Sequence, residues 1–159
     1  MSCLKKYNEP TQTEAPVFRR VYTSYRRVNE LLNEFHDELK LKGITFRVKG
    51  EEIGTCVFSD AQTVMLLREA LSMAAEAVAR CRGSSSHYIQ VNNMIMQHKQ
   101  FLKIVYSSES NQDVRDIHYQ NMEQILLKKA GYIKLENGEN ENTLMIAIDT
   151  EKSKNRQKK

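Results

Sequence analysis

The sequence lacks any long apolar run, and this absence bears on where the protein works. No stretch approaches the roughly 18 consecutive apolar residues that a membrane-spanning helix needs. The start of the chain, MSCLKKYNEP, is polar and lacks the apolar region of a secretory signal. We therefore expect a cytoplasmic protein without a membrane span.

Cysteine and proline are also scarce. The three cysteines include no CxxC pair and are odd in number, which argues against a disulfide framework and against a cysteine-based zinc site. The two prolines both lie within residues 1–16, a stretch without periodicity. We expect these residues to form a flexible leader, and ordered structure to begin near residue 17.

Positive charge is concentrated at one end of the chain. The formal net charge is +4, and residues 150–159 alone hold five basic residues and one acidic residue. Such a composition is typical of a disordered, basic tail. The remaining chain is balanced in charge and has no basic face that would follow a phosphate backbone, so we expect no nucleic-acid partner. Residues 17–149 are long enough to bury a hydrophobic core as one domain.

Hydrophobic periodicity predicts three helices and six short strands. Apolar residues recur every three or four positions over 18–42, 60–82 and 117–130, the spacing of one helical face. Alternating or β-branched runs predict strands at 44–48, 56–58, 87–91, 101–106, 132–135 and 144–148. Gly43 is placed to end the first helix, Ser59 or Asp60 to cap the second, and 92–100 to connect two strands as a hairpin loop.

The order of these elements is a helix followed by two strands, three times over. It predicts an α+β two-layer sandwich, in which a mixed, mostly antiparallel sheet carries about three helices on one face. An order of elements does not by itself name a function.

Several segments resemble the histidine-kinase type of ATP-binding domain, which has the Bergerat fold. Residues 31–48, LLNEFHDELKLKGITFRV, resemble the entry of that domain, where a helix leads through Gly-Ile into the first strand. Residues 66–78, LLREALSMAAEAV, are similar to the N-box, which reads close to REALTNALRHA in typical members. Residues 101–110 and 117–148 resemble the strand before the first glycine box and the closing helix and hairpin. The resemblance covers about residues 25–149 and implies a domain that binds ATP and Mg²⁺.

The resemblance places Glu69 at the N-box glutamate, which lies beside the triphosphate and activates an attacking group or orients the water around Mg²⁺. Four residues later the family has an asparagine whose side-chain oxygen binds Mg²⁺, and this sequence has Met73. A thioether is a soft, weak ligand, whereas Mg²⁺ requires hard oxygen donors. The metal site as the family builds it is therefore absent.

The adenine and phosphate motifs depart from the family in the same direction. Ser107, Ser108 and Glu109 stand where the family has the aspartate that accepts a hydrogen bond from adenine and the glycine behind it. Ser107 offers a weaker, uncharged acceptor, and Glu109 would substitute after a small shift of register. The second glycine box has no glycine around residues 118–121. Glu69, Met73, Ser107 and Glu109 are thus the residues expected at a degenerate ATP pocket.

The histidines and the first helix raise further possibilities. His36, in FHDEL, looks like the phospho-accepting motif of this kinase class, but only 32 residues and two predicted strands separate it from Glu69, so we interpret the likeness as chance. His87, His98 and His118 have no metal-ligand spacing, and we expect no metal site. The apolar stripe of the helix expected within 17–42 either covers the sheet or pairs with a signalling partner or a second copy as a homodimer.

Taken together, the residues predict a degenerate histidine-kinase ATP-binding-like domain that serves as a regulatory or protein-interaction module in signal transduction, with poor or no ATP hydrolysis. One alternative is a competent but divergent ATP-binding domain of a two-component sensor histidine kinase, with phosphoryl transfer as its chemistry. A second alternative is an anti-sigma or adaptor protein on the same fold, which acts by binding a partner.

Overall fold

The structure is a computed structural model, and it describes residues 20–53, 60–82, 86–109, 116–128 and 131–149. Within these residues the chain forms three helices and five strands. In order they are α1 (Arg26–Leu41), β1 (Thr45–Gly50), α2 (Asp60–Ala79), β2 (Tyr88–Met96), β3 (Lys99–Ser107), α3 (Ile117–Leu127), β4 (Gly131–Asn137) and β5 (Glu141–Asp149). None of the described helices is both long and apolar enough to cross a membrane.

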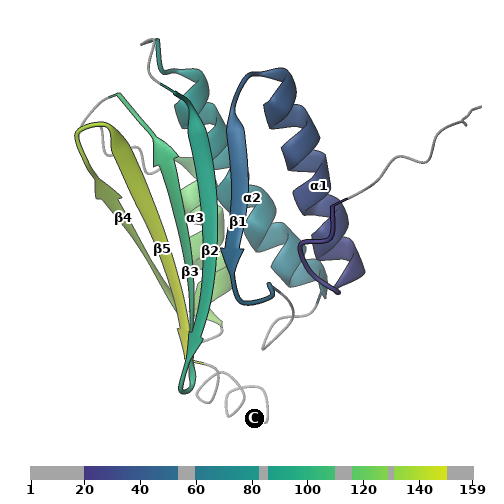
Figure 1. Cartoon of the computed structure of the whole chain (residues 1–159). Coiled ribbons are helices and arrows are strands. Elements are labelled where there is room, and N and C mark those ends of the chain that lie inside the picture. The colour runs from purple at the N-terminus through teal and green to yellow at the C-terminus, as the bar shows by residue number, and fades with distance from the viewer. Residues whose placement is uncertain (1–19, 54–59, 83–85, 110–115, 129–130, 150–159) are drawn as a thin grey trace, which may run out of the picture.

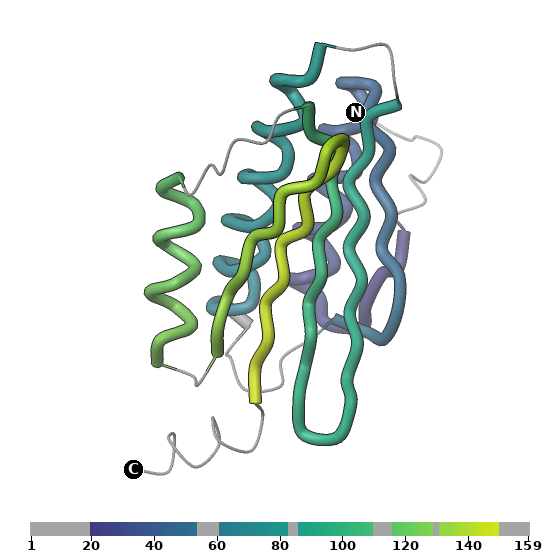
Figure 2. Tube along the Cα trace, turned by 90° about the vertical axis from the view of Figure 1, so that its left-hand side faces the viewer, coloured from purple at the N-terminus to yellow at the C-terminus, as the bar shows by residue number. Residues whose placement is uncertain are grey.

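The five strands form one sheet in the order β1-β2-β3-β5-β4. β1 pairs with β2 in parallel, and every other neighbouring pair is antiparallel. The three helices lie on one side of this sheet: in Figure 1 they are to the right of the strands and behind them, and in Figure 2 they are to the left of the strands and behind them. The predicted two-layer α+β sandwich, with a mixed and mostly antiparallel sheet, is therefore confirmed.

The hydrophobic core lies between the two layers. Along β2 and β5, buried side chains alternate with more exposed ones, because successive residues of a strand point to opposite faces of the sheet. The apolar stripe of α1 is buried in the same core through Val28, Leu32, Phe35 and Leu39. This stripe packs against the chain's own sheet and α2, which is the first of the two alternatives predicted for it.

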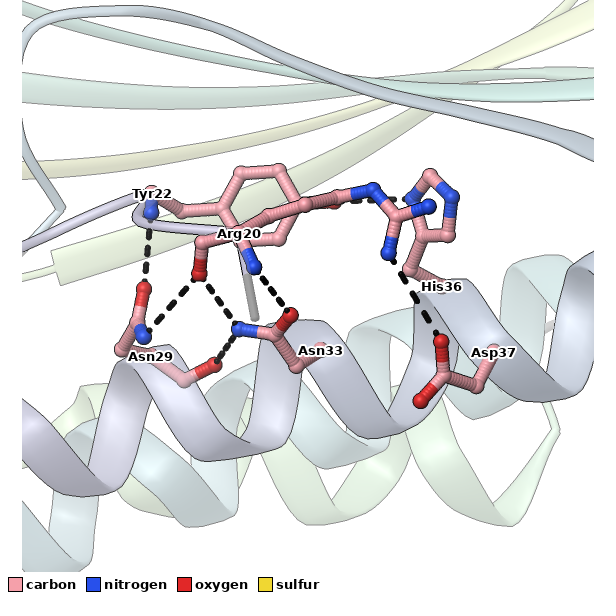
Figure 3. A network of polar contacts seen from close by, with 6 residues as sticks. All are labelled: Arg20, Tyr22, Asn29, Asn33, His36 and Asp37. Carbon is pink, nitrogen blue, oxygen red and sulfur yellow. Dashed lines mark hydrogen bonds and ion pairs between the residues drawn. The ribbon is translucent and has the colours of Figure 1, made fainter. Parts of the chain in front are cut away.

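The prediction that the first helix begins near residue 18 is wrong, because α1 begins at Arg26. Residues 20–25, here called the N-terminal strap, instead lie against α1 (Figure 3). The backbone N–H of Tyr22 donates to Asn29 Oδ1 at 2.7 Å, and that of Arg20 donates to Asn33 Oδ1 at 3.0 Å. Asn33 Nδ2 returns a bond of 2.8 Å to the Arg20 carbonyl. These side-chain bonds satisfy strap backbone groups that a longer helix would have paired internally.

The predicted hairpin loop at 92–100 is also wrong. β2 continues to Met96 and β3 begins at Lys99, so that the connection is only Gln97 and His98, with Gln97 at a φ of 56°. Two helices end earlier than predicted: α2 ends at Ala79 instead of residue 82, and α3 ends at Leu127 instead of residue 130. The predicted strand at 56–58, the cap at Ser59, the leader at 1–16 and the tail at 150–159 lie outside the described residues.

Candidate functional site

The most concentrated polar chemistry lies where α2 faces α3. Glu69 and Glu76 are seven residues apart on α2, which is two helical turns and places both carboxylates on one face. His118, in the first turn of α3, lies between them. His118 Nδ1 is 2.8 Å from Glu69 Oε2, and Nε2 is 2.8 Å from Glu76 Oε2. Each ring nitrogen therefore has its own carboxylate.

Two further residues complete this group, which we call the His118 cluster: Glu69, Glu76, Asp116, His118 and Asn121. Asn121 Nδ2 donates to the same Glu69 Oε2 at 3.2 Å. Asp116 precedes α3, and its Oδ1 accepts from the backbone N–H of Tyr119 at 3.2 Å. Of the five members, only Glu69 is among the predicted pocket residues, and His118 and Asn121 lie where the resemblance implies the second glycine box.

Burial and charge act on the His118 ring in opposite directions. Burial of the ring lowers the pKa of His118, but the hydrogen bonds to Glu69 and Glu76, together with the negative charges of Glu76 and Asp116, raise it by more. The pKa therefore lies above the ordinary value of about 6.5. When both nitrogens carry hydrogen, both can donate to the flanking carboxylates, so that the cluster holds α2 and α3 together as a charge-assisted link.

Met73 follows Glu69 by one turn of α2 and is part of the hydrophobic core. Its exposed fraction is 3%, so that the thioether packs among apolar neighbours rather than facing solvent. Asparagine at this position is the Mg²⁺ ligand that the resemblance implies. A buried methionine offers no oxygen for that purpose.

Ser107 and Glu109 lie away from Glu69, near the C-terminal end of α2. The Ser107 hydroxyl accepts from the backbone N–H of Tyr88 at 3.2 Å, and the Ser107 side chain is buried. The Glu109 carboxylate accepts from the backbone N–H of Arg82, just beyond the end of α2. Glu69 lies ten residues before that end, about 15 Å along the helix axis at 1.5 Å per residue. Of the four predicted pocket residues, the structure gives Glu69 a polar partner on α3 and ties Ser107 and Glu109 to the backbone.

The start of α3, where the resemblance implies a phosphate-binding glycine box, is capped by the chain itself. Asp116 is the N-cap residue, and its carboxylate occupies the Tyr119 N–H. The positive end of the helix dipole therefore already faces a negative side chain. A phosphate approaching this helix end would meet the charge of Asp116.

His36 is held in a separate network on α1 (Figure 3). Its Nδ1 is 2.8 Å from the hydroxyl of Tyr22, and its ring lies edge-on to Phe46 with centroids 6.1 Å apart. Burial, with the charge of Arg20, lowers the pKa of His36. Arg20 also approaches Asp37 at 3.7 Å. His36 thus helps to attach the N-terminal strap to α1.

A groove of about 410 Å³ runs between α1 and α2. Arg27 and Glu30 from α1 and Met65 from α2 are among the side chains that line it. Arg68 and Glu34 meet across it at 3.3 Å. Met65 is 55% exposed, so that the groove presents apolar surface between charges of both signs.

Comparison with known proteins identifies the fold but no close relative. A scan against protein families gives no match, and neither does a search of curated proteins. The histidine kinase domain of the blue-light activated histidine kinase from Erythrobacter litoralis EL346 is similar in structure, with a TM-score of 0.68 at 10% identity over 89% of this chain and 69% of that one.

Two other kinases give the same result. The catalytic domain of histidine kinase ThkA has a TM-score of 0.61 at 15% identity, over 77% of this chain and 93% of that one. The Acinetobacter baumannii histidine kinase AdeS has a TM-score of 0.62 at 14% identity, over 79% and 64%. The chain therefore has the fold of histidine kinase catalytic domains, as the sequence resemblance predicted.

Proposed function

We propose that this chain is a degenerate histidine-kinase ATP-binding-like domain that works as a regulatory or protein-interaction module in a signalling system, with poor or no ATP hydrolysis. The observation that carries the proposal is the engagement of Glu69 by His118 and Asn121, one turn from a buried Met73. These contacts support the proposal, because they engage the residue that the resemblance places beside the nucleotide and leave no oxygen ligand at position 73.

The chemistry of Glu69 supports this proposal. One oxygen, Oε2, is shared between His118 Nδ1 and Asn121 Nδ2. To orient a metal-bound water or to activate an attacking group, this carboxylate would have to exchange at least one of those partners. Because a hydrogen bond to a charged group contributes about 1.5 to 3 kcal/mol, that exchange opposes nucleotide binding.

The start of α3 supports the proposal independently of Glu69. Helix starts bind phosphates through free backbone N–H groups and a favourable dipole. Here Asp116 caps the helix and adds a negative charge at the same place. Mg-ATP binding is therefore weakened in two ways: position 73 offers no metal ligand, and the start of α3 offers no free phosphate-binding site.

The groove between α1 and α2 is the surface we propose for a partner. The apolar stripe of α1 is buried in the core and is not free for another molecule. The groove retains exposed apolar surface at Met65, flanked by Arg27 and Glu30. A helix from a signalling protein or from a second copy would place apolar residues on Met65 and opposite charges on the groove's rims.

Calorimetric titration of the chain with Mg-ATP tests the proposal. We expect a Kd weaker than about 1 mM, since two charge-assisted contacts are missing and each is worth tenfold or more. The Glu69→Ala variant is the matched control and should give the same weak signal. Micromolar binding by the wild type that Glu69→Ala abolishes would instead support a competent, divergent kinase domain.

A further inference from the structure

We propose that the His118 cluster is a binding site for a first-row divalent transition-metal ion of the Zn²⁺ class, with Glu76, Asp116 and Nε2 of His118 as its ligands. Each of these residues offers one donor atom, and the three atoms lie within 4.8 Å of one another. The proposal uses residues of the same cluster as the proposed function but does not rest on that function, because it involves no nucleotide.

The His118 ring is oriented for a ligand at Nε2. Protein metal sites commonly hold the second nitrogen of a ligating histidine with a carboxylate, which fixes both the tautomer and the ring plane. Glu69 does this here, 2.8 Å from Nδ1, and Asn121 holds the same Glu69 oxygen at 3.2 Å. Nε2 is thereby directed at Glu76, 2.8 Å away. A metal ion at Nε2 would take the place of the hydrogen that now bonds Glu76.

The donor set selects the class of ion. One imidazole nitrogen with two carboxylate oxygens suits Zn²⁺ and neighbouring divalent ions, whereas Mg²⁺ favours an all-oxygen shell and Cu⁺ favours sulfur. Two carboxylates offset the ion's charge, and Glu69 offsets it further from the far side of the ring. The Glu76 side chain is 54% exposed, so that water can complete the coordination shell.

The three donor atoms would have to move closer together to bind one ion. Ligand atoms lie about 2.0 to 2.2 Å from Zn²⁺, so that two ligands of a tetrahedral ion are about 3.4 Å apart. The three donor atoms now lie within 4.8 Å of one another, and Glu76 Oε2 is already 2.8 Å from Nε2. Adjustment of the Asp116 and Glu76 side chains would bring the three atoms to the spacing that the ion needs. Asp116 uses Oδ1 to cap α3 and has a second oxygen for the ion.

Titration calorimetry of the chelator-stripped full chain with ZnCl₂ at neutral pH tests the site. A background with Cys3→Ser, Cys56→Ser and Cys81→Ser removes the three thiols of the chain as competing ligands. We expect one site that His118→Ala and Glu76→Gln each weaken at least tenfold, and that Glu69→Gln weakens by about 10- to 100-fold through the orientation of the ring. His98→Ala, which removes an exposed histidine at the β2–β3 turn, should leave the Kd unchanged.

Glu76→Gln is the variant least expected to unfold the protein, because the Glu76 side chain is half exposed. Thermal melts can verify that it is folded. Zinc affinity that persists in folded Glu76→Gln and His118→Ala would overturn the proposal. The proposal would also be overturned if the wild type gave no heat of zinc binding at zinc concentrations up to about 1 mM, or if His98→Ala were the only variant that lost binding.

Discussion

Met73 occupies a position of the predicted nucleotide site, but its side chain is part of the hydrophobic core. Its side chain is 3% exposed within the core cluster. Met73→Asn would exchange a buried thioether for an amide without partners, and we expect a loss of about 2 to 4 kcal/mol in the free energy of unfolding. Met65→Asn on the same helix, where the side chain is 55% exposed, should cost far less. Urea denaturation of both variants, with and without Mg-ATP, measures this.

Nucleotide should not rescue Met73→Asn if the site is closed. A melting temperature that stays at the wild-type value and rises on addition of Mg-ATP would mean that residue 73 faces an open pocket, contrary to the core position described above.

His118 makes stability depend on pH in a defined direction. Burial lowers its pKa, but the bonds to Glu69 and Glu76 raise it by more, so that the folded-state value exceeds the unfolded value of about 6.5. The stabilisation is fully present below about pH 6.5 and is lost as the pH rises through the folded-state pKa. Wild type should therefore lose more unfolding free energy between about pH 6 and 9 than His118→Gln loses.

Denaturation with a metal chelator present isolates this proton effect from any bound ion. His98→Gln, at the exposed β2–β3 turn, is the matched control and should retain the wild-type pH dependence. Parallel pH profiles for wild type and His118→Gln would show that the link between α2 and α3 contributes nothing through its charge.

At the scale of single elements, Gly50 at the end of β1 has a role that Gly43 does not share. Gly50 has a φ of +89°, and a Cβ there would lie 2.1 Å from the backbone oxygen of Asn93. Gly43 has a φ of +73° with nothing within 4 Å of a Cβ. Gly43→Ala should cost about 1 to 2 kcal/mol from left-handed backbone strain alone. Gly50→Ala adds a clash with backbone and should cost about 3 to 4 kcal/mol.

Thermal or urea unfolding measures the loss of stability in the two alanine variants. Gly43→Ala reports backbone strain alone, and Gly50→Ala reports strain together with the clash. Equal losses at both glycines would show that β1 shifts away from Asn93 at little cost, and that the close approach of β1 to β2 is not fixed by Gly50.

Elements with strong local periodicity were predictable, and those shaped by distant partners were not. The stripe of α1, the end of that helix near Gly43 and the last hairpin follow rules of spacing and turn chemistry that act over a few residues. Asn92 and Asn93 have turn-like composition, yet both lie within β2. Asn93 is fully buried, where it donates to the carbonyls of Glu51 and Glu52 and accepts from Gln100. The two carbonyls are 42 and 41 residues away in the sequence.

The candidate site divides in the same way. The N-box resemblance singled out Glu69, because a helical motif is a local pattern. The sequence did not connect His118 with its two carboxylate partners, since they are 49 and 42 residues away on another helix. Only the packing of α3 on α2 reveals that these side chains converge. An unexpected histidine where a glycine box was due is the one trace of this arrangement in the sequence.

At the scale of the whole molecule, one face of the sheet carries the helices (Figure 1). The groove between α1 and α2 is the surface proposed for a partner. If that surface binds a second copy, sedimentation should show association that increases with concentration. Met65→Glu should abolish it, because a carboxylate would be buried at the centre of the contact without a compensating charge. The variant should fold normally, since Met65 is 55% exposed in the single chain.

Leu127→Glu is the matched control for this prediction, because Leu127 is a similarly exposed apolar residue, 66% exposed, on α3. It should leave association unchanged, whereas Met65→Glu should shift the sedimentation coefficient to that of a monomer at every concentration. Association that survives Met65→Glu but not Leu127→Glu would move the interface to α3 and contradict the assignment of the groove. A wild type that is monomeric throughout would exclude the second copy as occupant, and Met65→Glu would then be measured against a helical signalling partner.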